Sequence, residues 1–428
     1  MRFVSTRGVA PAVDITAALA AGLAPDGGLY VPDPIPCAPP LDADADLADI
    51  ASRLLAPYFD DSPLAAALPA ICADAFDFPA PRLPLDDSGD AVLELFHGPT
   101  AAFKDFGARF LARALGALRH DGDPDVTVLV ATSGDTGAAV AAAFDRRPGF
   151  RVVVLYPDGR VSPRQAHGLG CWGDNVRALR VAGTFDDCQR LVKQALGDAA
   201  LRARVPLASA NSISLGRLLP QAAYYARAAL RQQRDTGAPA NFIIPTGNLG
   251  NASACWLARR MGPPLGDIVL ACNANDVLPR YFDGAPYTPA DARATLANAM
   301  DVGAPSNFER LRHWHVDDAA LRGAMRAFSV DDAAIRAAIA QAASDGAPVP
   351  CPHTATGLDV LRRLRAAGDT RAWIVVATAH PAKFESVVEP CIGRSVEAPP
   401  ALADCLARPA HADPMAPDYD ALRAVLLG

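Results

Sequence analysis

The stretch Val126-Thr-Val-Leu-Val-Ala131, followed by Ser133-Gly-Asp-Thr-Gly137, indicates the fold class. A short run of β-branched and apolar residues is typical of a buried strand, and the turn after it leads into an Ala-rich, helix-like segment. The same order returns in Asn241-Phe-Ile-Ile-Pro245 and Thr246-Gly-Asn-Leu-Gly-Asn251, which also precede a helix-like segment. Further candidate strands are residues 151–156, 268–272 and 373–378. Strand, turn and helix in succession predict an α/β protein with parallel strands.

The chain divides into three predicted regions. Residues 1–85 carry many turn signals, such as Pro25-Asp26-Gly27-Gly28, and are predicted to form a separate N-terminal cap. We place the first α/β lobe at residues 86–210 and the second at residues 211–428, although no Pro/Gly-rich linker marks that boundary.

Composition narrows the class of protein. The 428 residues are 51% hydrophobic and 20% charged, which excludes a small module and a mainly disordered chain. A formal charge of −7 without long basic runs argues against nucleic acid as a partner. No apolar stretch approaches the roughly 18 residues of a membrane span, and residues 1–8 do not resemble a signal peptide. Nine cysteines without a C-x-x-C pair predict neither a disulfide framework nor a zinc site, so we expect a cytoplasmic protein.

Two turns are candidate anion sites. In Thr246–Asn251, small residues between a strand and a helix let backbone N–H groups converge on a phosphate. No Gly-Lys-Ser/Thr follows, which disfavours a triphosphate, and an ordinary strand-to-helix turn is the alternative. In Ser133–Gly137, hydroxyl and N–H groups could receive a carboxylate, with a simple helix N-cap as the alternative.

Three other features of the sequence bear on possible chemistry. Lys104 lies among Phe103, Asp105 and Phe106, where loss of solvent could lower its pKa and leave a neutral amine for an imine, although a surface lysine is the alternative. Residues 168–173 match G-x-G-x-x-G, but they lack the preceding strand of a dinucleotide site, and we interpret them as a loop leading into residues 175–181. His313 and His315 have no third ligand at a suitable spacing, so no metal is predicted.

Several segments together resemble the threonine synthase family, pyridoxal-phosphate enzymes with a tryptophan-synthase-β-like fold (fold type II). The segments are Phe96–Gly107, Ala131–Gly137 and Pro245–Asn251, supported by Gly22–Pro32 and Ala377–Phe384. The resemblance runs from about residue 1 to 395. It implies two open lobes with mostly parallel sheets, an N-terminal cap segment, and pyridoxal 5'-phosphate as cofactor.

The resemblance also assigns site residues. It implies that Lys104 binds the cofactor covalently, that Asp135 lies near the phenolic oxygen and that the Thr354 hydroxyl faces the pyridine nitrogen. The implied cofactor phosphate loop consists of Gly247, Asn248, Leu249, Gly250 and Asn251. The implied substrate residues are Ser133 and Thr136 for the carboxylate and Asn211, Ser212 and Arg217 for the phosphate. Three residues depart from the family pattern, namely Leu249, Cys351 and Ser214.

The implied reaction converts O-phospho-L-homoserine and water to L-threonine and phosphate. One alternative is a related pyridoxal-phosphate lyase that releases a 2-oxo acid, and another is a noncatalytic binding protein or nucleotide binder. The expected partner is the small-molecule substrate, with no nucleic acid and no membrane, and the expected assembly is a monomer or homodimer.

Overall fold

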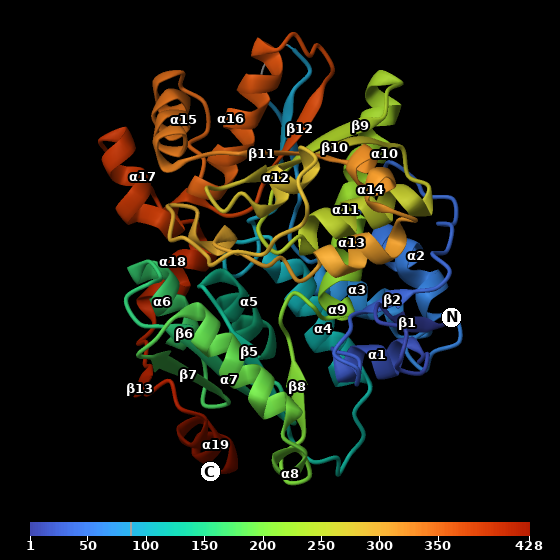
Figure 1. The fold of residues 1–428 in the computed structure, drawn as a ribbon, viewed down its shortest axis with the longest axis vertical. Helices are drawn as coiled ribbons and strands as arrows, with labels where there is room; N and C mark the ends of the chain where they lie inside the picture. Colours follow the sequence, from blue (N-terminus) through green and yellow to red (C-terminus); the bar gives the residue numbers. More distant parts are fainter. Residues whose placement is uncertain (86–87) are drawn as a thin grey trace.

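The computed structural model describes residues 1–85 and 88–428. Its two larger sheets confirm the predicted α/β class, and Figure 1 shows one in the upper half of the molecule and the other in the lower half. The predicted strands are confirmed with small differences at their ends. The boundary expected between residues 85 and 86 adjoins residues 86–87, which lie outside the described part of the chain.

The smaller sheet is parallel throughout, in the order β13-β7-β6-β5-β8. Its strands are β5 (Val126–Ala131), β6 (Phe150–Pro157), β7 (Val176–Val181), β8 (Leu207–Ser209) and β13 (Asp413–Met415). Alternate side chains face opposite layers: Val128 and Val130 pack toward α5 (Asp135–Phe144), and Leu129 packs toward α7 (Phe185–Gly197). Around this sheet lie α4 (Lys104–Ala117), α6 (Pro163–Gly170), α8 (Ala199–Arg202), α18 (Pro400–Ala407) and α19 (Tyr419–Leu427).

The larger sheet has the order β11-β10-β9-β12-β4-β3, and only its edge strand β3 is antiparallel. Its strands are β3 (Arg82–Pro84), β4 (Ala91–Glu94), β9 (Ala240–Pro245), β10 (Leu265–Cys272), β11 (Arg326–Ser329) and β12 (Trp373–Ala377). The helices of this lobe are α10 (Ala222–Thr236), α11 (Gly250–Met261), α12 (Val277–Phe282), α13 (Phe308–Trp314), α14 (Asp318–Ala324), α15 (Asp332–Ser344), α16 (Pro352–Ala366) and α17 (Glu385–Ile392). Buried side chains on both faces of the sheet explain why its inner strands β9, β10 and β12 are almost continuously apolar.

The N-terminal segment forms a small unit beside these lobes, at the right of Figure 1. It contains the antiparallel pair β1 (Phe3–Ser5) and β2 (Tyr30–Pro32), with α1 (Ile15–Ala21), α2 (Leu47–Phe59) and α3 (Leu68–Ala75). Helices α2 and α3 pack on α10 and α4, so the segment shares the main core. Two short helices, α9 (Leu215–Leu218) and the 3-10 turn η1 (Leu219–Gln221), pack against α4.

The sheets draw strands from both sides of the division predicted at residues 210–211. Strand β4 precedes the division and pairs with β12, whereas β13 follows it and pairs with β7. The two sheets are therefore linked by chain crossings in both directions, and the division itself stays a prediction.

Residues 163–170 form helix α6, so the interpretation of residues 168–173 as a loop was wrong for their first part. The Ser162 side chain accepts from the N–H of Gln165, and the Gln165 side chain accepts from the N–H of Ser162. This reciprocal capping box, with Pro163 at the first helical position, starts the helix. The Ser-x-x-Gln spacing was visible in the sequence.

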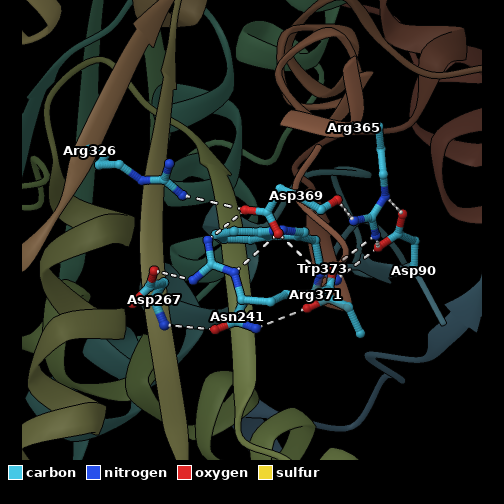
Figure 2. A network of polar contacts seen from close by, with 9 residues as sticks. Asp90, Asn241, Asp267, Arg326, Arg365, Asp369, Arg371 and Trp373 are labelled. Atoms are coloured by element: carbon cyan, nitrogen blue, oxygen red, sulfur yellow. Dashed lines mark hydrogen bonds and ion pairs between the residues drawn. The ribbon is translucent and has the colours of Figure 1, made fainter. Parts of the chain in front are cut away.

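A polar network fixes the amino ends of the larger sheet, as Figure 2 shows. The buried Asp90 carboxylate accepts from the backbone N–H of Trp373 at 2.8 Å and forms an ion pair with Arg365. Arg371 pairs with Asp267 and Asp369, which connects the starts of β10 and β12. These contacts hold the strand register at the edge opposite the turns that follow β9 and β12.

We expect Asp90→Asn to destabilise the fold by roughly 1–3 kcal/mol, because the Arg365 guanidinium loses a buried anionic partner. Urea unfolding with a fixed m-value measures the loss. The matched control is Asp276→Asn, which breaks the exposed Asp276–Arg280 pair and should cost less than about 1 kcal/mol. Equal effects of the two substitutions would contradict a structural role for the buried network.

Candidate active site

Three segments meet where strands β5, β8 and β9 end. The Nδ2 of Asn211, just after β8, donates to the carbonyl oxygen of Ala131 at the end of β5 (2.8 Å). The neighbouring Ser212 Oγ accepts from Nδ2 of Asn248 in the turn after β9 (2.6 Å). The two predicted anion turns are thus connected through residues 211–212, at the carboxyl edge where parallel α/β sheets bind ligands.

Lys104 begins helix α4 beside these turns. The N–H of Phe103 donates to the carbonyl oxygen of Thr378 (2.8 Å), and Ala102 pairs with Ala379 in an isolated bridge. These bonds fix the start of α4 against the segment that follows β12. The Lys104 side chain is partly buried, and none of the described residues forms a hydrogen bond or ion pair with its Nζ atom.

The surroundings of Lys104 lower its pKa and so increase the fraction of neutral amine near pH 7. Burial lowers the pKa of Lys104 to about 8; the negative charge of Asp135 opposes this, and the positive charges of Arg217 and Lys383 lower the pKa further. At pH 7 roughly one molecule in ten then carries a neutral amine, far more than for an ordinary lysine. A nucleophilic amine is therefore available near neutral pH.

Asp135 is the buried anion of the site. It is the first residue of α5, where the helix dipole favours a negative charge. Its Oδ1 lies 2.9 Å from Nζ of Lys383 and accepts from Nε2 of Gln165 at 3.1 Å. Burial alone would raise the pKa of Asp135, but Lys383 and Lys104 outweigh it and hold that pKa well below its usual range. Asp135 is a carboxylate at neutral pH.

The turn Thr246–Asn251 has the shape of a phosphate loop. Gly247 lies so close to Met300 that a Cβ would meet its Cα at 2.7 Å, so a side chain at position 247 does not fit. Leu249 adopts a left-handed conformation (φ 62°) immediately before α11. This backbone path turns the first N–H groups of α11, which have no intrahelical partners, toward the carboxyl edge of the sheet.

The side chains of this loop are engaged by protein. Asn248 binds Ser212, and its backbone oxygen accepts from Nδ2 of Asn307 (2.9 Å). The Oδ1 of Asn251 accepts from the hydroxyl groups of Tyr224 and Tyr225, so that side chain faces the core of α10 and α11. A phosphate at the loop would contact backbone N–H groups, and the Nδ2 of Asn251 is a further buried donor without a partner among the described residues.

Arg217 is a buried cation whose charge acts on Lys104. The residue is 2% exposed, and its Nη1 donates to the carbonyl oxygen of Ala210 (2.8 Å). Burial lowers the pKa of Arg217 to about 10, which leaves it charged at neutral pH. Three buried polar atoms here have no hydrogen-bond partner among the described residues: Nε of Arg217, Oδ1 of Asn211 and Oγ of Ser214. Two of these atoms, Nε of Arg217 and Oγ of Ser214, are donors that a bound anion could satisfy.

Thr354 lies at the start of α16, and its hydroxyl is buried. Its Oγ1 accepts from the N–H of Thr378 at 3.3 Å and lies 3.2 Å from Sγ of Cys351. The Thr378 hydroxyl is buried without a partner among the described residues. Two neutral hydroxyl groups therefore lie at the end of β12, and burial keeps the nearby His353 neutral by lowering its pKa to about 4.

The structure brings most of the predicted residues to one region. Lys104, Asp135, Thr354, Asn211, Ser212, Arg217 and the 247–250 loop all belong to segments in contact at the carboxyl edges of the sheets. Ser133 and Thr136 are partly exposed in the turn that starts α5, where a substrate carboxylate could reach them. Among the described residues there is no group of three or more His, Cys, Asp or Glu side chains that could hold a metal ion.

Sequence reasoning missed several residues of this region. Lys383, Gln165, Thr378, Asn307 and Arg310 were not assigned individually. Lys383 had a detectable signal, since the chain has only three lysines among 40 basic residues, and Lys104 is another of them. Asn307 and Arg310 had none, because nothing in their local sequence indicates contact with a turn some 60 residues earlier.

Comparison with known proteins identifies the class of enzyme. The family described as "Pyridoxal-phosphate dependent enzyme" matches residues 91–381, which is more than half of the chain. Two further matches cover the ends: "Threonine synthase N terminus" at residues 2–76 and "Threonine synthase, C-terminal" at residues 354–426. The fold and site are therefore those of a pyridoxal-phosphate-dependent enzyme.

Similarity along the whole chain specifies the family. Threonine synthase from Haemophilus influenzae is 38% identical over 423 residues, and the alignment covers 97% of this chain and 97% of that relative. Threonine synthase from Escherichia coli is 35% identical, and the alignment covers 97% of this chain and 96% of that relative. The crystal structure of the Escherichia coli threonine synthase aligns with a TM-score of 0.87 at 34% identity, covering 100% of this chain and 99% of the other. A structure of threonine synthase from Brucella melitensis with bound PLP gives 0.88 at 33% identity and the same coverage. The chain belongs to the threonine synthase family.

We expect Lys104 of the cofactor-free protein to react with acetic anhydride with a half-maximal rate near pH 8. Its folded pKa lies below 10.5, so its neutral fraction falls about tenfold for each pH unit below 8 and saturates above that value. Competitive acetylation followed by peptide mass spectrometry measures the titration. The exposed Lys193 is the internal reference; a Lys104 midpoint at or above 10 would contradict the effect of burial.

Proposed function

We propose that this protein converts O-phospho-L-homoserine and water to L-threonine and inorganic phosphate. Lys104 is the lysine that binds pyridoxal phosphate covalently, and the 247–251 loop holds the cofactor phosphate. Asn211, Ser212 and Arg217 bind the phosphate of the substrate.

The buried Arg217 beside Lys104 carries this proposal. A Cβ on Gly107 would meet the carbonyl oxygen of Arg217 at 2.5 Å, so α4 and α9 touch backbone to backbone one turn after Lys104. A guanidinium with an unpartnered Nε is suited to a phosphate, which accepts paired hydrogen bonds. An amine beside two candidate phosphate sites supports a role with a phosphorylated amino acid and a phosphorylated cofactor.

The residues of the site have separate roles in the proposed reaction. When bound, pyridoxal phosphate supplies an electron sink that stabilises negative charge on the adjacent carbon. The released Lys104 amine removes and returns protons, a role suited to a group with a pKa near 8. Ser133 and Thr136 orient the substrate carboxylate at the start of α5. Thr354 would supply a neutral hydroxyl and Asp135 a carboxylate to the ring of the bound cofactor.

The setting and assembly are part of the same proposal. None of the helices among the described residues is long and apolar enough to span a membrane. We place the enzyme in the cytoplasm, with the small-molecule substrate as its partner and a monomer or homodimer as its assembly.

Assay of the purified holoenzyme with O-phospho-L-homoserine tests the activity. Phosphate and L-threonine should form in equal amounts, and Lys104→Ala should abolish both because the covalent link and the proton carrier are lost. Release of 2-oxobutyrate instead of threonine would favour the related lyase. Retention of a nucleotide but not of pyridoxal phosphate would favour a binding protein.

Arg217→Met should reduce kcat/KM for the phosphorylated substrate by roughly 10- to 150-fold, as expected for the loss of charged hydrogen bonds that contribute about 1.5–3 kcal/mol. Steady-state kinetics measure the change, and circular dichroism checks the fold. The control Arg53→Met removes an exposed arginine of α2 and should leave kcat/KM unchanged. Equal values for the two variants would contradict the assignment of Arg217.

A further inference from the structure

Lys383 is a second buried lysine at the site. It lies in the 3-10 turn η3 (Pro381–Phe384), shortly after β12, and is 3% exposed. Its Nζ donates to the carbonyl oxygen of Thr100 (2.7 Å) and forms an ion pair with Oδ1 of Asp135 (2.9 Å). An ammonium group has three donors, and these two partners among the described residues leave one free direction.

The ion pair joins the two lobes. Asp135 follows β5 of the smaller sheet, whereas Lys383 follows β12 of the larger sheet. Two more bonds reinforce the junction: Ser162 Oγ donates to the carbonyl oxygen of Lys383 (2.9 Å), and Arg164 donates to that of Ala382 (2.7 Å). Helix α6 and the turn η3 are therefore docked together, and Gln165 of α6 also donates to Asp135.

Lysine is rare in this chain, so two lysines near Asp135 indicate a requirement for lysine at these positions. Lys104, Lys193 and Lys383 are its three lysines among 40 basic residues, and two of them carry charges that act on Asp135. Lys383 cannot replace Lys104 as a free amine, because its Nζ is already held by a carboxylate and a carbonyl. An arginine fork is wider and needs more acceptors than these two partners provide.

We propose that Lys383 is a positioning residue of the active site, whose ammonium group holds the Asp135 carboxylate in place at the lobe junction between the two lysines. This inference rests on the proposed role of Lys104. Lys383 then has an electrostatic role in addition to packing. Its positive charge balances the negative charge of Asp135, so that Asp135 raises the proton affinity of Lys104 less than it would alone.

The other charged groups around Lys104 set the direction of the effect. Asp135 on α5 favours protonation of Lys104, whereas Arg217 on α9 and Lys383 on η3 oppose it. His353 on α16 is neutral near pH 7 because burial lowers its pKa. Asp105 on α4 is engaged by the N–H and hydroxyl of Thr100. Removal of Lys383 leaves the Asp135 charge unbalanced, so Lys104 should bind its proton more tightly.

Three variants of the full-length protein test the inference: Lys383→Met, Lys383→Arg and the pair Lys383→Met/Asp135→Asn, with Lys193→Met as the matched control on the exposed face of α7. Competitive acetylation of the cofactor-free protein gives the titration midpoint of Lys104. Equilibrium titration with pyridoxal phosphate gives its dissociation constant. Borohydride reduction of each holoenzyme and peptide mapping identify the lysine that carries the cofactor.

We expect Lys383→Met to move the Lys104 midpoint upward by on the order of one pH unit, the effect of one nearby charge, and to weaken cofactor binding at pH 7 about tenfold. Lys383→Arg should keep the midpoint closer to that of the wild type. The double variant should return it toward the wild-type value because both charges are removed, a correction that a purely structural defect would not show. Lys193→Met should change neither quantity.

Two outcomes separate this inference from the proposed function. If the label lies on Lys104 but Lys383→Met leaves the midpoint and the dissociation constant unchanged, the positioning role is wrong and the proposed function stands. If the label lies on Lys383 in the wild type, the role proposed for Lys104 is wrong, and the inference falls with it. Should Lys383→Met fail to fold, Lys383→Gln supplies the same comparison, because it removes the positive charge and keeps a donor for the carbonyl oxygen of Thr100.

Discussion

The ion pair between Asp135 and Lys383 ties together the parts on which the site depends. Placing a carboxylate at 3% exposure is costly unless cations and hydrogen bonds surround it. Here the partners are the ammonium of Lys383, the amide of Gln165 and the amino end of α5. Each partner comes from a different element, so the charge of Asp135 is stabilised only when α5, α6 and η3 are assembled. The same assembly sets the protonation of Lys104.

Strand direction explains why these elements meet. In parallel sheets the carboxyl ends of the strands share one edge, and each strand leads into a turn and a helix whose amino end faces that edge. The turns after β5, β8, β9 and β12 supply Asp135, Asn211, the 247–251 loop and Thr378. The opposite edge of the larger sheet contains the network around Asp90 and Arg371, which contributes to strand register (Figure 2). The candidate active site thus lies at the carboxyl edge of the sheets, and the polar network that stabilises the larger sheet lies at its opposite edge.

The sequence predicted the features that depend on local pattern. The apolar runs identified β5 and β9, and the glycine-rich turns identified two candidate anion sites, because strand burial and turn geometry are encoded within a few residues. The resemblance then supplied roles that pattern alone leaves open, such as that of Thr354. Helix α6 carries two competing local signals, because the G-x-G-x-x-G spacing of residues 168–173 is typical of a loop whereas the Ser-x-x-Gln capping box of residues 162–165 predicts a helix. The pairing of β13 with β7 could not be predicted, because it joins residues more than 200 positions apart and depends on tertiary packing.

Arg310 illustrates what a linear sequence cannot show. Its guanidinium is fully buried and donates to the backbone oxygens of Tyr30 and Ile213 and to Oδ1 of Asn307. Asn307 in turn donates to the backbone oxygens of Asn248 and Ser212, which belong to the two segments that we propose bind phosphate. None of the described residues forms an ion pair with Arg310, and burial lowers its pKa to about 9, so it is still charged at neutral pH. A buried cation whose direct hydrogen-bond partners are all neutral is costly, although the negative charge of the neighbouring Glu309 favours it. Its cost falls when anions lie close by, and two phosphates at the neighbouring segments would provide that charge. Arg310 therefore braces both segments and would also place a positive charge near the two phosphates that we propose bind there.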